Sequence, residues 1–279
     1  MSYSQLNQDN TVLEFFNNRK KLYFLDIGAN DGITLSNTYK LEKEYGWDGI
    51  CSEPLPDIFK KLKKCRNIHN DKNAVYSQSG LTLDFSDAAN DLLSGITKHI
   101  DAHHEAKNHK TVKVKTITLD KLLKKYKAPK TIHYMSLDTE GSEYEILKSV
   151  NHKDYKFLYI NLEHNYIEPR RTLMRELLEQ NGYLYKGENE FDDDYIHSST
   201  LTGKYYHNND YTKPITIKKV DKNKFMVSSD YWEKEYGEFK DGKIQFNERL
   251  GHGKIFYDKI EFSPENKWHR DNRKGRYKI

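Results

Sequence analysis

Apolar runs and amphipathic segments alternate along the first two thirds of the chain. Runs such as "KLYFLDIG" predict buried strands, whereas "SNTYKLEKEYG" has apolar residues at helical spacing and ends in a glycine. The expected strands cover residues 21–28, 47–54, 67–77, 81–88, 131–141, 157–165 and 183–188. The expected helices cover residues 11–19, 36–46, 57–66 with Asp57 as its cap, 118–126, 142–150 and 169–182. This order predicts an α/β fold, a mostly parallel sheet with helices on both faces, and ligands bind such sheets at the carboxyl ends of the strands.

The pattern changes after residue 204. The segments "PITIKKV", "KFMVSSDYW", "EYGEFKDGKIQF" and "KIFYDKIEF" are short, rich in β-formers and separated by Gly, Asp, Asn and Pro. Asp241-Gly242 is a typical hairpin turn. We therefore expect one domain over residues 1–204 and a small, C-terminal antiparallel β appendage over residues 205–279.

Composition narrows the classes of protein that the chain can belong to. The net charge is +4, and residues 205–279 carry 17 Lys and Arg against 12 Asp and Glu, so residues 1–204 are close to neutral. Because of this balance, we do not expect the protein to bind nucleic acid. No apolar run is long enough to span a membrane, and the N-terminus lacks the pattern of a signal peptide. Cys51 and Cys65 form neither a disulfide framework nor a zinc motif, which favours a cytoplasmic protein.

The stretch "LDIGANDG" places a glycine turn directly after a predicted buried strand. Gly28 lets a ligand approach the backbone closely, and Glu53 ends the next strand, where a carboxylate can accept both hydroxyls of a ribose. The G-x-G-x-x-G spacing of dinucleotide-binding loops is absent, and Asp26 suits a cationic ligand better than a pyrophosphate. A simple tight turn between strand and helix is the alternative interpretation.

Several ordered motifs carry a resemblance to a known family. They are "LDIGANDGITLSNTYKLEKEYGWDGICSEPLPDIFKKL", "NAVYS" and "HYMSLDTEGSEYEILKSV", flanked by "SQLNQD" and "NLEHNYIEPRRTLMRELLEQNGY". Over residues 4–200 the chain resembles the FkbM-type family of S-adenosylmethionine-dependent methyltransferases. The resemblance implies a class I methyltransferase fold and methyl transfer to oxygen, often to a sugar hydroxyl. Ser52 departs from the pattern, because a more apolar residue commonly precedes the glutamate.

The resemblance also implies cofactor-binding residues. Asp26, Gly28, Asn30 and Gly32 would surround the methionine half of S-adenosylmethionine, Glu53 would hold the ribose, and Asn73 and Ala74 would lie beside the adenine. Gln8 and Ser36 are further candidates for contact with the cofactor.

Acidic residues follow two strands that we expect to be neighbours. Asp138 ends one strand, and Glu163, His164 and Asn165 end the next. Removing the proton of a hydroxyl acceptor needs a base, for which His164 is a candidate with Asp138 and Glu163, or a bound cation. Asp138, Glu163 and Asn165 offer the oxygen ligands that Mg²⁺ or Mn²⁺ prefers. For His164, the alternative is a structural histidine that is bonded to backbone. Glu140 could have either a functional or a structural role. Glu143 is interpreted as a helix-start charge.

Two further polar segments stay ambiguous. In "DDDY", Asp193 or Asp194 could add a metal ligand, although a solvated acidic loop is the preferred interpretation. The segment from residue 91 to 110 contains His103, His104 and His109. Their spacing does not support zinc, and a polar substrate loop or a plain surface loop is expected instead.

The C-terminal region interleaves aromatic and basic residues. Trp268 and Arg270 are candidates for binding a sugar, because a ring stacks on its apolar face while polar groups meet its hydroxyls. A charged edge hairpin or a homodimer contact is the alternative. We thus expect a glycan O-methyltransferase that uses a sugar-containing acceptor. An RNA ribose 2′-O-methyltransferase and a lectin-like protein with an inactive methyltransferase domain are the competing hypotheses.

Overall fold

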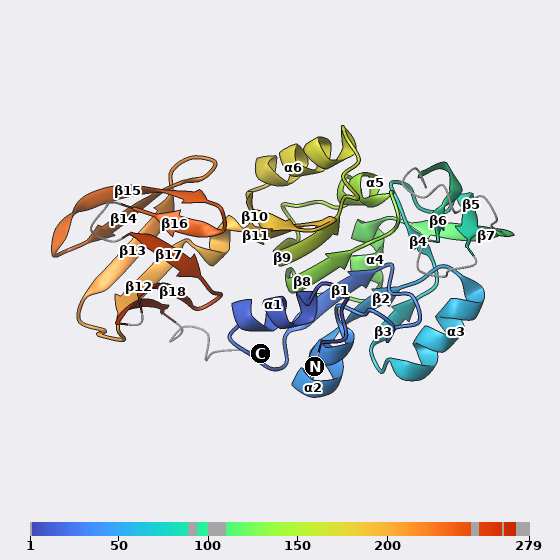
Figure 1. Cartoon of the computed structure of the whole chain (residues 1–279), viewed down its shortest axis with the longest axis horizontal. Coiled ribbons are helices and arrows are strands. Elements are labelled where there is room, and N and C mark those ends of the chain that lie inside the picture. The colour runs from blue at the N-terminus through green and yellow to red at the C-terminus, as the bar shows by residue number, and fades with distance from the viewer. Residues whose placement is uncertain (1, 89–93, 100–109, 247–250, 264, 272–279) are drawn as a thin grey trace.

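A seven-stranded sheet forms the centre of the molecule in a computed structural model, which describes residues 2–88, 94–99, 110–246, 251–263 and 265–271 (Figure 1). The strand order is β10-β11-β9-β8-β1-β2-β3. Strand β11 runs opposite to the other six strands of this sheet. The strands are β1 (Tyr23–Ile27), β2 (Asp48–Ser52), β3 (His69–Asp71), β8 (Thr131–Leu137), β9 (Lys156–Glu163), β10 (Tyr183–Asn189) and β11 (Asp192–His197).

Helices cover both faces of this sheet, because successive strand residues point to opposite sides. Phe24, Tyr134 and Tyr159 belong to one apolar core with α1 (Gln8–Phe15), α2 (Tyr39–Tyr45) and α3 (Pro56–Cys65). The adjacent residues Leu25 and Met135 belong to a second core with α4 (Leu119–Lys125), α5 (Glu143–Leu147) and α6 (Arg170–Gln180). The predicted α/β architecture with a mostly parallel sheet is therefore confirmed.

A small second sheet lies beside the carboxyl ends of β1 and β2. It has the order β4-β7-β5-β6, with β4 (Ala74–Val75), β5 (Thr82–Asp87), β6 (Gly95–Ile96), followed by the short η2 (Thr97–His99), and β7 (Lys110–Ile117). The expected strands did not include β7, although Val112, Val114 and Thr116 alternate with lysines as in a half-buried strand.

The C-terminal region is a closed antiparallel barrel. After the short η4 (Ser198–Thr200), its strands are β12 (Gly203–His207), β13 (Pro214–Lys219), β14 (Lys224–Ser229), β15 (Trp232–Lys240), β16 (Lys243–Gln245), β17 (His252–Ile255), β18 (Lys259–Ser263) and β19 (Asn266–Arg270). Asp241 and Gly242, with φ of 48° and 72°, form the expected β15–β16 hairpin turn. The predicted antiparallel character is confirmed. The closure into a barrel was not predicted: β19 pairs with β12, which removes the free edge of the sheet.

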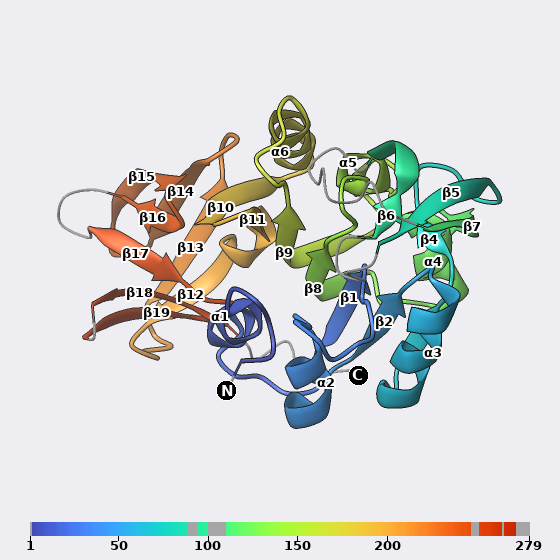
Figure 2. The ribbon, with the colours of Figure 1, turned by 45° about the vertical axis from the view of Figure 1, so that its right-hand side comes forward.

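The barrel is packed directly on the α/β part. Apolar residues of the barrel and of the α1 face of the sheet form one continuous core. The Tyr257 amide donates to the Phe15 carbonyl over 2.9 Å, and Arg19 pairs with Asp258 at 2.8 Å. Figures 1 and 2 both show the barrel at one end of the central sheet and the small sheet at the other. In the described part of the chain, no helix is long and apolar enough to cross a membrane.

Some element ends differ from the prediction. Helix α1 begins at Gln8, three residues early, and α2 is shorter than residues 36–46, although it ends as expected at Gly46 with φ of 63°. Helix α3 begins at Pro56 with Leu55 at the N-cap position, so Asp57 lies in the first turn and is not the cap. Proline fits the first helical position because its missing N–H would have had no partner there.

Candidate active site

A cavity of about 330 Å³ opens at the carboxyl ends of β1, β2, β8 and β9. Ten predicted site residues line it: Gln8, Asp26, Gly28, Asn30, Ser36, Glu53, Ala74, Asp138, Glu163 and Asn165. Phe85, Ser94 and Ile96 add a wall from the small sheet. Ser94 and Ile96 lie in the segment expected as a substrate loop, whereas His103, His104 and His109 fall outside the described residues.

Gly28 allows three strand ends to meet at the floor of the cavity. Its amide donates to the Ser52 carbonyl, and the Asp138 amide donates to the Ile27 carbonyl, both over 3.1 Å. With φ of +89°, a Cβ at Gly28 would lie 1.6 Å from the Asp138 carbonyl oxygen. No side chain fits there, so the close approach of backbones explains the glycine.

Gly32 differs from the other residues of the predicted loop. It does not line the cavity, and its Cβ, at φ of +82°, would lie 2.6 Å from Leu62 Cδ1. Helix α3 packs so closely here that residue 32 has no room for a side chain, which explains the glycine. The position of Gly32 does not support the predicted contact with the cofactor.

The buried guanidinium of Arg66 stabilises the loop around Asp26. The Asp26 carboxylate accepts from the Thr38 hydroxyl over 2.5 Å, and the Arg66 guanidinium donates to that hydroxyl and to the Gly32 carbonyl. Burial raises the pKa of Asp26, and the charge of Arg66 opposes this rise. Ser36 Oγ accepts from the Thr38 and Tyr39 amides at the start of α2. Arg66 supports this wall, and the sequence pattern did not single it out.

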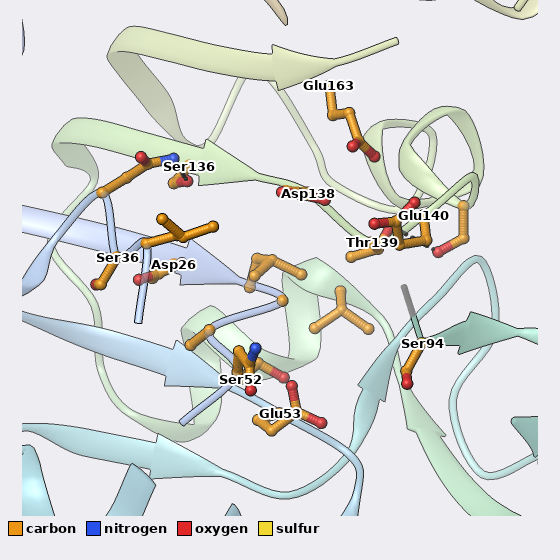
Figure 3. A pocket seen from close by; sticks show the side chains of 18 of the residues that line it. Asp26, Ser36, Ser52, Glu53, Ser94, Ser136, Asp138, Thr139, Glu140 and Glu163 are labelled. Atoms are coloured by element: carbon orange, nitrogen blue, oxygen red, sulfur yellow. Dashed lines mark hydrogen bonds between the residues drawn. The ribbon is translucent and has the colours of Figure 1, made fainter. Parts of the chain in front are cut away.

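Glu53 reaches the cavity from the end of β2 (Figure 3). Its Oε1 accepts from the Leu55 amide over 2.8 Å, which holds the carboxylate in place. Ala74 lines the same side of the cavity, but Asn73 does not. Asn73 instead donates to Asp71 over 2.7 Å and accepts from Ser52 Oγ through its carbonyl, so its position does not support direct contact with the cofactor.

Three carboxyl groups gather on the opposite side of the cavity. Figure 3 shows Asp138, Glu140 and Glu163 together, and each offers an oxygen within 4.8 Å of the others. Part of Asp138 is accessible from the cavity, but the surrounding protein desolvates its carboxylate and, with the charge of Asp192, raises its pKa to about 7. Burial and the neighbouring carboxylates raise the pKa of Glu140 to about 9 and also raise that of Glu163.

The turn after β8 directs Glu140 into this cluster. Glu140 has a left-handed φ of 58°, which is uncommon for a residue with a side chain. The buried Glu143 carboxylate holds the turn by accepting from the Thr139 and Gly141 amides over 2.8 and 3.0 Å. Glu143 therefore acts on the backbone at the helix start, as the sequence indicated, and Glu140 joins the site.

The carboxyl cluster can hold a proton or a cation. Carboxyl groups this close cannot all ionise at neutral pH unless a positive charge joins them. Carboxylate oxygens suit Mg²⁺ or Mn²⁺, and Asn165 lines the cavity nearby with an amide oxygen to add. The residues present thus fit a hard divalent cation, with Glu140 in addition to the predicted ligands Asp138, Glu163 and Asn165.

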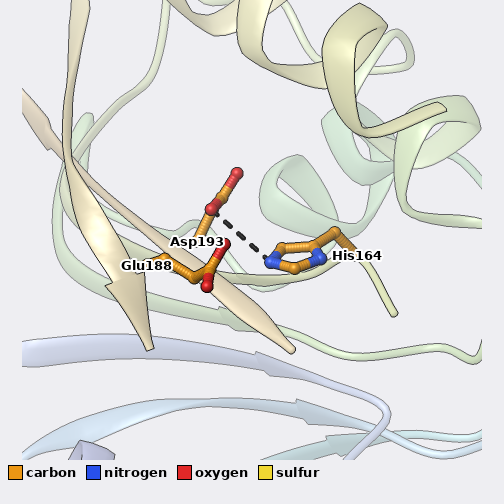
Figure 4. A group of neighbouring side chains, drawn as sticks. All are labelled: His164, Glu188 and Asp193. Carbon is orange, nitrogen blue, oxygen red and sulfur yellow. Dashed lines mark ion pairs between the residues drawn. The ribbon is translucent and has the colours of Figure 1, made fainter. Parts of the chain in front are cut away.

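His164 lies outside the cavity lining, which does not support its predicted role as the base. Its ring is buried, and Nδ1 accepts from the Tyr166 amide over 2.9 Å. Its Nε2 lies 3.5 Å from Asp193 Oδ1 (Figure 4), and burial lowers its pKa. Because side chains alternate at the strand end, His164 faces away when Glu163 faces the cavity. The alternative interpretation, a histidine bonded to backbone, matches this geometry.

The "DDDY" segment forms strand β11, so the interpretation as a solvated acidic loop is wrong. All three aspartates are buried. Asp193 pairs with Arg171 at 2.6 Å, and Asp194 accepts from the Tyr159 hydroxyl over 2.6 Å. Asp192 lines the cavity and accepts from Gln8 Nε2 over 2.9 Å, and burial raises its pKa to about 6. The apolar Tyr195 and Ile196 were the signal for a strand.

Trp268 and Arg270 have structural positions in the barrel, which do not support their predicted contact with a sugar. Trp268 is 2% exposed and packs against Phe262, with ring centroids 4.7 Å apart. Arg270 donates to the Ser199 carbonyl over 3.1 Å and to the Tyr205 hydroxyl over 2.9 Å. Closure of the barrel turns Trp268 inward, and the half-buried Arg270 donates to carbonyls where the barrel joins the α/β part.

Comparison with solved structures gives distant similarities. An FkbM methyltransferase from Methylobacillus flagellatus KT is 13% identical, with a TM-score of 0.40 over 63% of this chain and 44% of that one. A precorrin-6y C5,15-methyltransferase from Geobacter metallireducens GS-15 is 14% identical, with a TM-score of 0.38 over 67% of this chain and 85% of that one. The plantazolicin methyltransferase BpumL, solved in complex with SAH, is 13% identical, with a TM-score of 0.30 over 65% and 66%.

The family is shown by a sequence match. This chain spans less than half the length of the Methylobacillus protein, and no curated protein matches it. The model of the methyltransferase FkbM domain matches residues 26–185, which is more than half of the 279 residues. The matched region begins at Asp26 and contains Glu53, the turn with Glu140 and the end of β9. The chain therefore belongs to the FkbM methyltransferase family.

Proposed function

We propose that the protein is an S-adenosylmethionine-dependent O-methyltransferase that acts on a sugar hydroxyl of a glycan or glycoconjugate. The observation that carries this proposal is the arrangement of one cavity, with Glu53 on one side and the cluster of Asp138, Glu140 and Glu163 on the other. The first side fits a nucleoside and the second fits a hydroxyl that must lose its proton.

The residues of the first side fit the cofactor. Glu53 is fixed by the Leu55 amide and would accept the ribose hydroxyls, and Ala74 would lie beside the adenine. Asp26 adds a carboxylate to the cavity lining, and Asp192 adds another from β11, where it pairs with Glu163 of β9; both favour the positive sulfonium and amino groups of the methionine half. When bound, S-adenosylmethionine supplies an electrophilic methyl group.

The residues of the second side fit the acceptor. Asp138, with a pKa of about 7, can take a proton near neutral pH, where a general base is most effective. A divalent cation held by Asp138, Glu140 and Glu163 would instead lower the pKa of the hydroxyl. Both routes favour oxygen as the methylated atom, and the family resemblance favours a sugar as its carrier.

Calorimetry tests the cofactor site. Glu53→Gln should weaken S-adenosylmethionine binding at least about tenfold, because hydrogen bonds to a charged group contribute ~1.5–3 kcal/mol. Asp57→Asn makes the same change in charge at an exposed position on α3 and serves as the control. Equal affinities for both variants would remove the ribose assignment.

A methyl-transfer screen tests the acceptor. Labelled S-adenosylmethionine would be offered with mono- and oligosaccharides, with and without EDTA. We expect label in at least one neutral sugar, and loss of transfer in EDTA would assign the cation to the reaction. Transfer to capped RNA that exceeds transfer to every sugar would overturn the acceptor class.

A further inference from the structure

The outer wall of the barrel carries a second depression, which we name the barrel groove. It is an open depression of about 530 Å³ that crosses strands β12 to β15. Lys204 pairs with Thr216 across β12 and β13, and Thr216 pairs with Ser228 across β13 and β14. Ile215, Ile217 and Val227 of the same strands are buried in the barrel core. The alternating residues Thr216 and Ser228 therefore point outward, in a row across the strands.

A register shift shapes the far side of the barrel groove. The pairing of β14 with β15 is irregular between Val227 and Ser229, where Ser229 faces Trp232. Such irregularities bend a strand and increase its local twist. Trp232 is partly buried against the barrel core, which limits the freedom of its ring, and it lines the groove. The neighbouring Tyr231 is 61% exposed.

The lining of the barrel groove is polar and balanced in charge. Lys204 and Lys234 oppose Asp230 and Glu233, so these four charges sum to zero. Lysines donate hydrogen bonds, carboxylates accept them, and the hydroxyls of Thr216 and Ser228 do both. Trp232 and Pro214 add apolar surface.

We propose that the barrel groove binds a segment of a neutral oligosaccharide. Sugar hydroxyls both donate and accept, which matches the mixed lining, and the apolar face of a sugar ring matches Trp232. A single-stranded nucleic acid would need an excess of positive charge, which this lining lacks. These residues replace Trp268 and Arg270 as the sugar contacts of the barrel.

The groove would hold the acceptor chain while one of its hydroxyls enters the cavity. This part rests on the proposed function, because it assumes that the acceptor is a glycan. The barrel shares a core with the central sheet, so the groove and the cavity are parts of one packed body.

The test is binding of fluorescently labelled neutral hexasaccharides of glucose, mannose or N-acetylglucosamine to the full-length protein. We expect at least one to bind, with affinity about tenfold weaker in Trp232→Ala. Thr216→Arg fills the groove from an outward position, and it should cause the same loss even if Trp232→Ala disturbs folding. Tyr236→Ala, at a 64% exposed position outside the groove lining, should bind as the wild type does.

Three results would overturn the proposal. One is that no hexasaccharide binds at about 1 mM, and another is that Thr216→Arg leaves binding unchanged. Stronger binding of a thymidine dodecanucleotide, lost in Thr216→Arg, would assign the groove to nucleic acid and also refute it. Glu53→Gln separates the two proposals, because it should lower methyl transfer about tenfold or more at limiting S-adenosylmethionine but leave hexasaccharide binding intact.

Discussion

Replacing Asp138 by asparagine should lower the pKa of Glu140. The two carboxyl groups offer oxygens within 4.8 Å of each other, and Asp138 is the main charged group that raises the pKa of Glu140 to about 9. Asp138 itself has a pKa of about 7, so it is already ionised when Glu140 titrates. Asparagine keeps the shape of the side chain but removes its charge.

The size of the effect follows from the separation. The carboxyl oxygens lie within 4.8 Å of each other, and two unit charges at that limit interact by ~3.5 kcal/mol at an effective dielectric constant of 20, which equals about 2.5 pKa units. The pKa of Glu140 should therefore fall from about 9 by about 2.5 units. It should stay above the ordinary value of a glutamate, because burial and the Glu143 charge remain.

Carbon-13 NMR of the full chain, labelled at the glutamate carboxyl carbons, measures this pKa. The Glu140 signal is assigned by its absence in Glu140→Gln. Asp154→Asn, at an exposed position, removes one charge elsewhere and should leave the midpoint unchanged. A midpoint that moves by less than about half a unit in Asp138→Asn would refute the reasoning, because the cluster would then be too weakly coupled to gather around a cation.

Three further outcomes are expected. Gly28→Ala should lower the free energy of unfolding by ~3 kcal/mol or more in a urea titration, because its φ is positive and its Cβ would clash with Asp138. Gly46→Ala has open space around its Cβ and should cost only about 1 kcal/mol. Trp268→Ala should cost ~3–5 kcal/mol as a core deletion, against ~0.5 kcal/mol or less for the exposed Tyr236→Ala, and equal losses would contradict the buried position of Trp268. Glu140→Gln should become more stable relative to the wild type as pH rises from about 5 to 9. The folded wild type keeps the Glu140 proton up to about pH 9 while the unfolded chain loses it near pH 4, so rising pH costs the wild type stability at this group that Glu140→Gln does not lose, and parallel curves would contradict the raised pKa.

The strand ends explain why so much of the cavity was predictable. Asp26, Glu53, Asp138 and Glu163 each stand at or directly after the end of an expected parallel strand. The carboxyl ends of such strands meet at one edge of the sheet, so residues more than a hundred positions apart could be placed together without coordinates. The turn after β1, with Gly28, Asn30 and Gly32 at positive φ, also gave a local conformational signal.

Other site residues depended on pairings that no local pattern contains. Gln8 and Asp192 hydrogen-bond across 184 positions of sequence, and β11 carries Asp192 to the cavity only because it inserts antiparallel beside β9. A difference of one residue separates Glu163, in the cavity, from His164, behind it. Assigning these sides requires the register of the strand end, which depends on its neighbours.

By itself, the sequence determined the alternation of strands and helices, the turns at Gly28, Gly46 and Asp241, and the acidic residues at the ends of the strands. These features follow from side-chain periodicity and local backbone preference, which act over a few residues. Only the tertiary structure decided that the barrel closes over Trp268, that Glu140 joins Asp138 and Glu163, and that Trp232 faces a groove. Burial and charge coupling are properties of the neighbours that a side chain meets, and distant parts of the chain supply those neighbours only when it folds.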